Sequence, residues 1–254
     1  MPAAPLRMLE AHARLYRKNW RASVFSSFLN PVLFLVAMGL SLGTLVDDGG
    51  GLGVPYLTFL APGLLAATGM QAGVGEGSWP VMAGFKWRRS FHVAVTTPLQ
   101  PNDVLFGTLA WAALRVLAVV TAYALVITAF GAVDLVPSLL SIWPAALTGV
   151  AFVAPVMAYT ARLEKDTSLS SLMRFGIVPL FLFSGTFFPI TQLPVWIQPL
   201  AYVTPLWHGV ELTRAVATGT TTTFAPAIHA AVLVLFVVAG VALAAPAFKK
   251  KLLV

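Results

Sequence analysis

Residues Leu180 to Gly219 read LFLFSGTFFPITQLPVWIQPLAYVTPLWHGVELTRAVATG. The stretch begins as an apolar segment and then contains four prolines, at Pro189, Pro194, Pro199 and Pro205. Each proline inside a helix removes a backbone donor and costs about 3 kcal/mol, so one continuous spanning helix is excluded. The many bulky apolar side chains also exclude a water-exposed loop. The stretch therefore predicts a helix end followed by two short helices at, or dipping into, a membrane interface. Irregular backbone at membrane depth needs protein or a water cavity around it, which indicates a gate or an exit path.

Composition places the whole chain in a membrane. Of the 254 residues, 58% are hydrophobic and 10% are charged, and the mean hydropathy is +0.85. Soluble domains average about 25% charged residues. The chain has no cysteine, so its loops gain nothing from disulfides. We therefore expect an integral, all-α membrane protein.

Six apolar segments are near or above the roughly 20 residues that cross a bilayer as a helix. They cover residues 28–46, 56–79, 104–130, 138–161, 169–188 and 225–248. Residues 6–25 precede them and place Leu9, Tyr16 and Trp20 on one helical face, with Arg14 and Arg17 on the other. This pattern predicts an amphipathic helix that lies along an anionic membrane leaflet, and the alternative is a solvated helix with a packed stripe.

The positions of lysine and arginine predict the orientation. With the N-terminus in the cytoplasm, 14 of the 16 basic residues lie inside. Only Arg214 then lies outside, and Arg115 lies within a span. Six spans with both termini in the cytoplasm are therefore expected, in the cell membrane. The net charge of +7 is explained by this orientation and not by binding to nucleic acid.

No motif for chemistry is present in the sequence. It lacks the glycine-rich phosphate loop that ends in Gly-Lys-Ser/Thr, so ATP is not bound by that route. It also lacks a paired-histidine metal helix, and its four histidines are scattered. We expect no enzyme activity and no metal site in this chain.

Two charges stand out within the predicted spans, Glu76 in the second and Arg115 in the third. A charge near the bilayer centre costs at least about 2.5–3.5 kcal/mol, so such residues usually pair or face a cavity. One hypothesis is an ion pair that locks the two spans together and lines a transport route. The alternative is that Glu76 is interfacial and Arg115 extends its head group toward the membrane surface.

The polar stretch after the second span mixes aromatic and basic side chains. These residues are Phe85, Lys86, Trp87, Arg88, Arg89, Phe91 and His92. The mixture predicts a short amphipathic helix on the cytoplasmic side. Such a helix could dock in a groove of a soluble partner or bind only lipid head groups, and the pattern leaves both open.

Two stretches resemble a known family. Residues Phe183–Gly219 are similar to the C-terminal signature of ABC-2-type exporter permeases: F-S-G, a Phe-Pro break, L-P-x-W, P-L-x-H and a Leu-x-Arg helix. Residues Thr96–Arg115, TTPLQPNDVLFGTLAWAALR, resemble the T-P-L segment of the nodulation-factor-export branch. The resemblance covers essentially the whole chain as one transmembrane domain, residues 1–254.

The resemblance implies the transmembrane subunit of an ATP-driven exporter. Such permeases pair with a second permease, identical or a paralogue, and dock a separate ABC ATP-binding subunit that holds ATP and magnesium; this chain itself would bind no cofactor. The family's coupling helix corresponds to residues 82–92, its interfacial helix to 6–25 and its outer helix pair to 193–217. The external gate would contain Phe183, Gly185, Phe187, Phe188, Pro189 and Trp196. An acidic residue often precedes T-P-L in the family, whereas this chain has His92.

The cargo is left open by the sequence, because lipid-linked oligosaccharide, glycolipid and hydrophobic drugs all suit the fold. Membrane lipids are the other expected partners. A non-transporting membrane scaffold or assembly subunit of similar topology is the alternative function.

Overall fold

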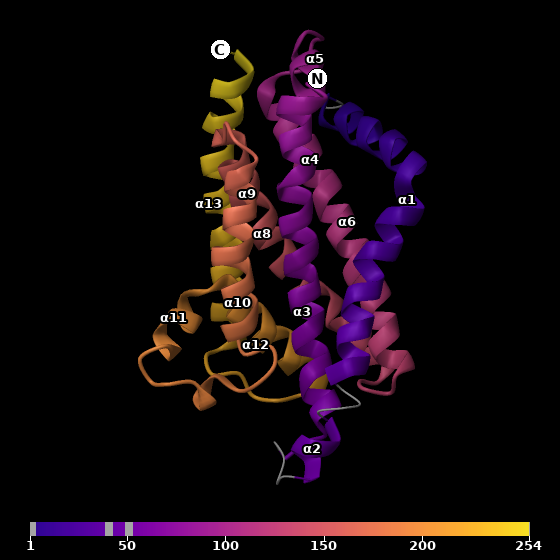
Figure 1. Cartoon of the computed structure of the whole chain (residues 1–254), viewed down its shortest axis with the longest axis vertical. Coiled ribbons are helices and arrows are strands. Elements are labelled where there is room, and N and C mark those ends of the chain that lie inside the picture. The colour runs from indigo at the N-terminus through magenta and orange to yellow at the C-terminus, as the bar shows by residue number, and fades with distance from the viewer. Residues whose placement is uncertain (1–3, 39–42, 49–52, 254) are drawn as a thin grey trace.

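The computed structural model describes residues 4–38, 43–48 and 53–253, and all regular structure in these ranges is helical. Four helices are long and apolar enough to cross a membrane, namely Tyr56–Trp87, Pro101–Ala129, Leu135–Arg162 and Pro226–Leu253. They lie side by side as an upright bundle (Figure 1). The all-helical membrane fold is confirmed, whereas the described residues give four clear spans where the sequence predicts six.

The first predicted span is only partly described. Helix α1 runs without interruption over Ala4–Val36 and so joins the predicted interfacial helix to the start of the span. It changes direction part-way and then descends beside α6 (Pro101–Ala129) (Figure 1). Helix α2 (Gly43–Asp48) follows; residues 39–42, in the middle of the predicted span, lie outside the described residues.

The second predicted span is longer than the sequence indicates. Helix α3 (Tyr56–Gly77) is followed by α4 (Trp79–Met82) and a π-helical segment, Ala83–Trp87. After a turn, α5 covers Ser90–Val95. The predicted helix 82–92 is therefore divided at Arg88 and Arg89, and Arg89 has the left-handed φ of 49° that ends the helix.

Long helices lie where the sequence predicts the fourth and sixth spans. Helices α7 (Leu135–Leu140) and α8 (Ile142–Arg162) form one, and α13 (Pro226–Leu253) forms the other. Small residues bring α3 and α8 together: a Cβ added at Gly73 would overlap the Gly149 carbonyl oxygen. A Cβ at Gly77 would lie 2.9 Å from the Val153 oxygen. Small residues spaced by four let helix backbones approach closely in membranes.

The fifth predicted span, 169–188, is shorter in the structure. Helices α9 (Thr167–Leu172) and α10 (Val178–Phe183) are joined by a π-helical segment, Met173–Ile177. The helix ends at Phe183 because the chain turns at Gly185, whose φ is +79°. A left-handed φ favours glycine, which has no Cβ to clash.

The proline-rich stretch forms short helices at the lower end of the bundle (Figure 1). They are a 3-10 turn at Ile190–Gln192, α11 (Gln198–Val203) and α12 (Pro205–Thr218). Pro199 is the second residue of α11 and Pro205 is the first of α12, positions where a missing N–H does no harm. The first predicted outer helix is thus shorter than expected. Helix α12 buries Leu206, Trp207 and Val210, so it packs into the bundle and does not lie on its surface.

Candidate functional site

Glu76 and Arg115 form an ion pair between α3 and α6. Arg115 Nε donates to Glu76 Oε1 at 3.1 Å, and the side chains are 18% and 10% exposed for Glu76 and Arg115, respectively. Arg115 Nη1 also donates to the Tyr16 hydroxyl at 2.6 Å, and the guanidinium lies 4.2 Å from the centre of the Tyr16 ring. The pair therefore joins three helices, because Tyr16 belongs to α1. The ion pair is one of the two alternatives that the sequence leaves open for these charges, and the sequence gives no signal for Tyr16.

A ring cluster supports this pair from the α1 side. Trp111 of α6 stacks on His12 with 6.1 Å between ring centres, and Tyr16 meets its edge at 5.6 Å. His12 Nε2 also lies 3.2 Å from the Thr108 hydroxyl. Burial, with the charge of Arg88 as a second cause, lowers the pKa of His12 to about 4. His12 is therefore uncharged at neutral pH.

The predicted coupling segment divides into inward and outward residues. Phe85 and Phe91 are buried and pack edge to face, 5.0 Å apart, with Phe248 of α13 4.8 Å from Phe85. His92 is half-buried, and its ring lies 6.2 Å from Phe85. The exposed residues of the segment are Lys86, Trp87, Arg88, Arg89 and Ser90.

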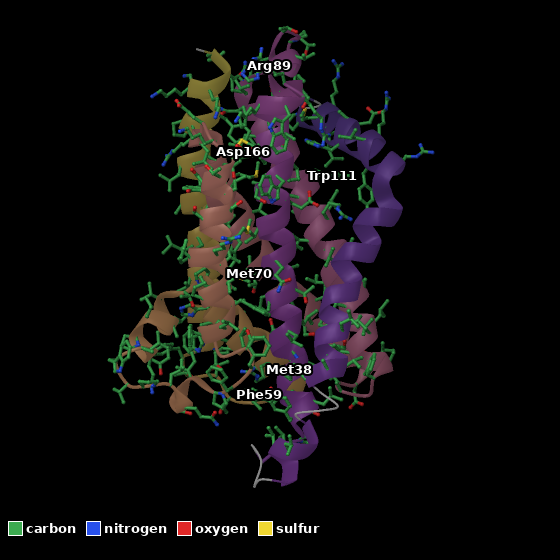
Figure 2. The ribbon with its side chains drawn as sticks, in the orientation of Figure 1. Met38, Phe59, Met70, Arg89, Trp111 and Asp166 are labelled. Atoms are coloured by element: carbon green, nitrogen blue, oxygen red, sulfur yellow. The ribbon has the colours of Figure 1, made fainter. Side chains whose placement is uncertain are left out.

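The outward residues lie at the upper end of the molecule, where Arg89 is labelled in Figure 2. Trp87 is 52% exposed and stacks on Trp79, with ring centres 6.1 Å apart. Lys86 Nζ donates to the Glu164 carbonyl oxygen at 3.2 Å and lies 3.8 Å from the Asp166 carboxylate. The bend after α3 is thereby attached to the loop between α8 and α9.

The predicted gate residues surround the turn after α10. Phe187 is buried against Phe181, 5.0 Å away, and its carbonyl oxygen accepts a hydrogen bond from Tyr56 Oη at 3.1 Å. Phe188 packs beside the small cluster formed around Ile190. Pro189 immediately precedes the 3-10 turn at Ile190–Gln192. The remaining gate residues are Phe183, 43% exposed, Gly185 at the turn, and Trp196, 79% exposed.

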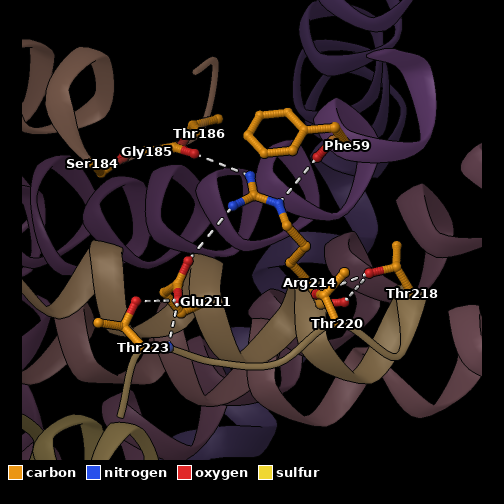
Figure 3. A network of polar contacts seen from close by, with 9 residues as sticks. All are labelled: Phe59, Ser184, Gly185, Thr186, Glu211, Arg214, Thr218, Thr220 and Thr223. Atoms are coloured by element: carbon orange, nitrogen blue, oxygen red, sulfur yellow. Dashed lines mark hydrogen bonds and ion pairs between the residues drawn. The ribbon is translucent and has the colours of Figure 1, made fainter. Parts of the chain in front are cut away.

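Arg214 holds this turn, a role that the sequence does not reveal, because the charge pattern places Arg214 only as an outer charge within the outer helix pair. Its Nη2 donates to the Gly185 oxygen at 3.0 Å and its Nε to the Phe59 oxygen at 3.3 Å (Figure 3). The guanidinium lies 3.9 Å from the centre of the Phe59 ring. Glu211 lies 3.8 Å from Nη1 and accepts two hydrogen bonds from Thr223, at 3.2 and 3.1 Å. One buried side chain thus joins α3, the turn after α10 and α12.

These features define a class of protein: a helical membrane protein with buried ionic contacts, a proline-broken end and an aromatic, basic surface at the other end. Within that class, the chain belongs to the ABC-2 type transporter family, whose model matches residues 6–218. It is therefore a membrane permease subunit of the ABC type.

Several curated relatives match most of the chain. Nodulation protein J of Sinorhizobium fredii (strain NBRC 101917 / NGR234) is 33% identical over 218 residues, which cover 84% of this chain and 82% of the relative. Nodulation protein J of Rhizobium leguminosarum bv. viciae is 30% identical, with 86% and 85% covered. Nodulation protein J of Bradyrhizobium diazoefficiens is 28% identical, with 79% and 76% covered. The expected resemblance is confirmed.

Proposed function

We propose that this chain is the membrane subunit of an ATP-driven exporter that moves a glycolipid, an oligosaccharide linked to lipid, or a similar lipid-like molecule or hydrophobic drug out of the cytoplasm or inner leaflet. The observation that carries the proposal is the ABC-2 match over residues 6–218, together with relatives of similar length. The resemblance to the nodulation-factor-export branch favours a lipid-linked saccharide among these cargoes.

Six crossings with both termini in the cytoplasm are part of the proposal. The beginning of α1 and the end of α13 lie at the same end of the bundle, beside α5 (Figure 1). Helix α1 continues beyond the predicted interfacial residues 6–25 as far as Val36, which supports the start of a first crossing. Tags at the two termini should both report from the cytoplasmic side. Tags that report from opposite sides would contradict the proposed topology.

Docking of a separate ATP-binding subunit is assigned to the exposed aromatic and basic surface after α3. Trp87 and Arg89 face outward, while Lys86 connects the same bend to Asp166 at the start of α9. Movement of a docked subunit would therefore be transmitted both to the bend after α3 and to α9. We expect Arg89→Glu to reduce co-purification of the ATP-binding subunit. Arg7→Glu, at an exposed position of α1, is the matched control.

A second copy of the permease is proposed to cover the outward face of α9 and α10. Phe175 on this face is 82% exposed and Val178 is 50% exposed. Arg174 is also exposed. The charge pattern counts it as cytoplasmic, yet it lies within the predicted fifth span, eight residues after Asp166, or about 12 Å along the helix. A charge that faces lipid at such depth is unfavourable, so protein or water is needed there.

The experiment that tests the whole proposal is reconstitution. The permease and an ATP-binding subunit encoded next to it are placed together in lipid nanodiscs, and ATP hydrolysis is measured with saccharide-linked lipids and with drugs. We expect hydrolysis only with both subunits present, and stimulation by a lipid-linked saccharide. Hydrolysis by the permease alone would contradict the proposal. Failure to associate with any ATP-binding subunit would favour the scaffold alternative.

A further inference from the structure

A cavity of about 260 Å³ lies between α1, the α3–α5 bend and α6. Met8, Leu15 and Trp111 contribute apolar surface to it. Polar lining groups include Arg88 and the Glu76–Arg115 ion pair. The cavity is thus lined like an amphiphile-binding site, with an apolar wall and a polar end.

The charges in the cavity leave one cation without a counter-ion. Glu76 is neutralised by Arg115 at 3.1 Å, and His12 is uncharged at neutral pH because its pKa is lowered to about 4. Arg88 is exposed; its backbone N–H donates to the Ala83 oxygen at 2.8 Å, but its guanidinium makes no hydrogen bond or ion pair with any residue in the described ranges. The cavity therefore has a net positive charge that is located at the Arg88 guanidinium.

The position of the cavity indicates what reaches it. It is bordered by the N-terminal part of α1, whose Arg7, Arg14 and Arg17 carry basic charge, and by the bend that follows α3. Basic amphipathic helices of this kind lie at the level of lipid head groups and attract anionic lipids. Arginine binds phosphate oxygens well because its planar guanidinium matches their geometry.

We propose that this cavity is a binding site for one anionic phospholipid, whose head-group phosphate pairs with Arg88 while an acyl chain lies along Met8, Leu15 and Trp111. The lipid bridges α1 to the bend after α3. Free phosphate satisfies only the polar end of the site, and a zwitterionic lipid brings its own cation toward Arg88. Both therefore bind more weakly than an anionic lipid.

The test uses the full-length permease, purified in detergent without an ATP-binding subunit. Short-chain phosphatidylglycerol, short-chain phosphatidylcholine and inorganic phosphate are titrated separately, and lipid adducts by native mass spectrometry and the melting temperature are measured. We expect phosphatidylglycerol to bind and to raise the melting temperature most. Arg88→Gln should weaken its binding at least tenfold, whereas Arg89→Gln, the neighbouring exposed arginine, should change it less than twofold.

A second variant tests the apolar wall. Leu15 is 43% exposed, so Leu15→Asp should leave the fold intact and still weaken phosphatidylglycerol binding. Equal losses in Arg88→Gln and Arg89→Gln would overturn the site in favour of general surface charge. A melting shift with inorganic phosphate equal to that with phosphatidylglycerol would overturn it in favour of a free anion. Because no ATP-binding subunit is present, neither result bears on the proposed export function.

Discussion

The ion pair between Glu76 and Arg115 joins two long helices in a largely apolar bundle. Removal of one partner leaves the other charge buried, and an unpaired buried charge is strongly unfavourable. We expect Glu76→Gln and Arg115→Leu each to lower the melting temperature. The stability loss of the double variant should be smaller than the sum of the two single losses, with a coupling energy of about 0.5–3 kcal/mol. Thermal unfolding of the purified permease and its three variants measures this coupling.

The exposed pair Glu10–Arg14 is a matched control for that cycle. Its atoms are closer, at 2.6 Å, but its side chains are 60% and 76% exposed. Solvent screens such pairs, so their coupling is small. If the stability losses of the two single variants add up in the Glu76–Arg115 cycle as they do in the control cycle, burial does not increase the coupling energy of the inner pair.

Arg214 gives a second prediction at the scale of one side chain. A lysine there would keep the charge but could not donate to both the Gly185 and Phe59 oxygens, because it lacks the planar fork. We expect Arg214→Lys to destabilise the permease by about 1–3 kcal/mol. It should also speed hydrogen exchange in residues 184–196, measured by mass spectrometry.

Glu211→Gln is the control, since its carboxylate is 3.8 Å from Arg214 and the amide oxygen can still accept from Thr223. We expect a smaller loss of stability in this variant. If Arg214→Lys leaves exchange in residues 184–196 unchanged, the guanidinium does not hold the turn.

At the scale of elements, the packing of α3 on α8 depends on glycine. A methyl group at Gly73 would overlap the Gly149 carbonyl oxygen, whereas nothing lies within 4 Å of a Cβ at Gly75. We expect Gly73→Ala to lower the melting temperature. Gly75→Ala should leave it equal or raise it, because alanine is favoured over glycine in helices by about 1 kcal/mol. Similar effects of the two variants would contradict close α3–α8 packing.

Long apolar helices such as α6 and α13 could be predicted from the sequence because lipid selects apolar side chains on every face of a spanning segment. The pairing of Glu76 with Arg115 is one of two arrangements that the sequence allows, since a charge in such a segment either pairs or extends its head group toward the membrane surface. Arg214 could not be placed in this way. The charge pattern places it on the outer side of the membrane, within the outer helix pair, and only the packing of α12 into the bundle buries it.

The bend after α3 was harder to predict than the helices around it. A continuous helix over residues 82–92 satisfies the mixed aromatic and basic pattern, yet the chain turns at Arg89 with a φ of 49°. This non-glycine residue adopts a rare conformation that composition does not reveal. The turn allows both Phe85 and Phe91 to contact Phe248, a partner more than 150 positions away.

For the whole molecule, the arrangement of two permeases can be tested directly because the chain has no cysteine. A single Phe175→Cys variant therefore introduces one thiol, on the outward face of α9 and α10. If a second copy covers this face, we expect a bismaleimide to cross-link the variant into dimers in native membranes. Arg174, next to this thiol, requires surroundings other than lipid. A second copy that supplies them would bring its own thiol close to the first.

Val238→Cys of α13, at a position 60% exposed, is the control for cross-linking by random collision. Lipid can cover this position without cost, because its long apolar helix has no charge on that stretch. We expect few dimers from this variant at the same expression level. Equal yields from the two variants, or none from Phe175→Cys when Val238→Cys reacts, would exclude α9 and α10 as the contact between copies. Arg174 would then need water or cargo, and not a second permease, to accommodate its charge.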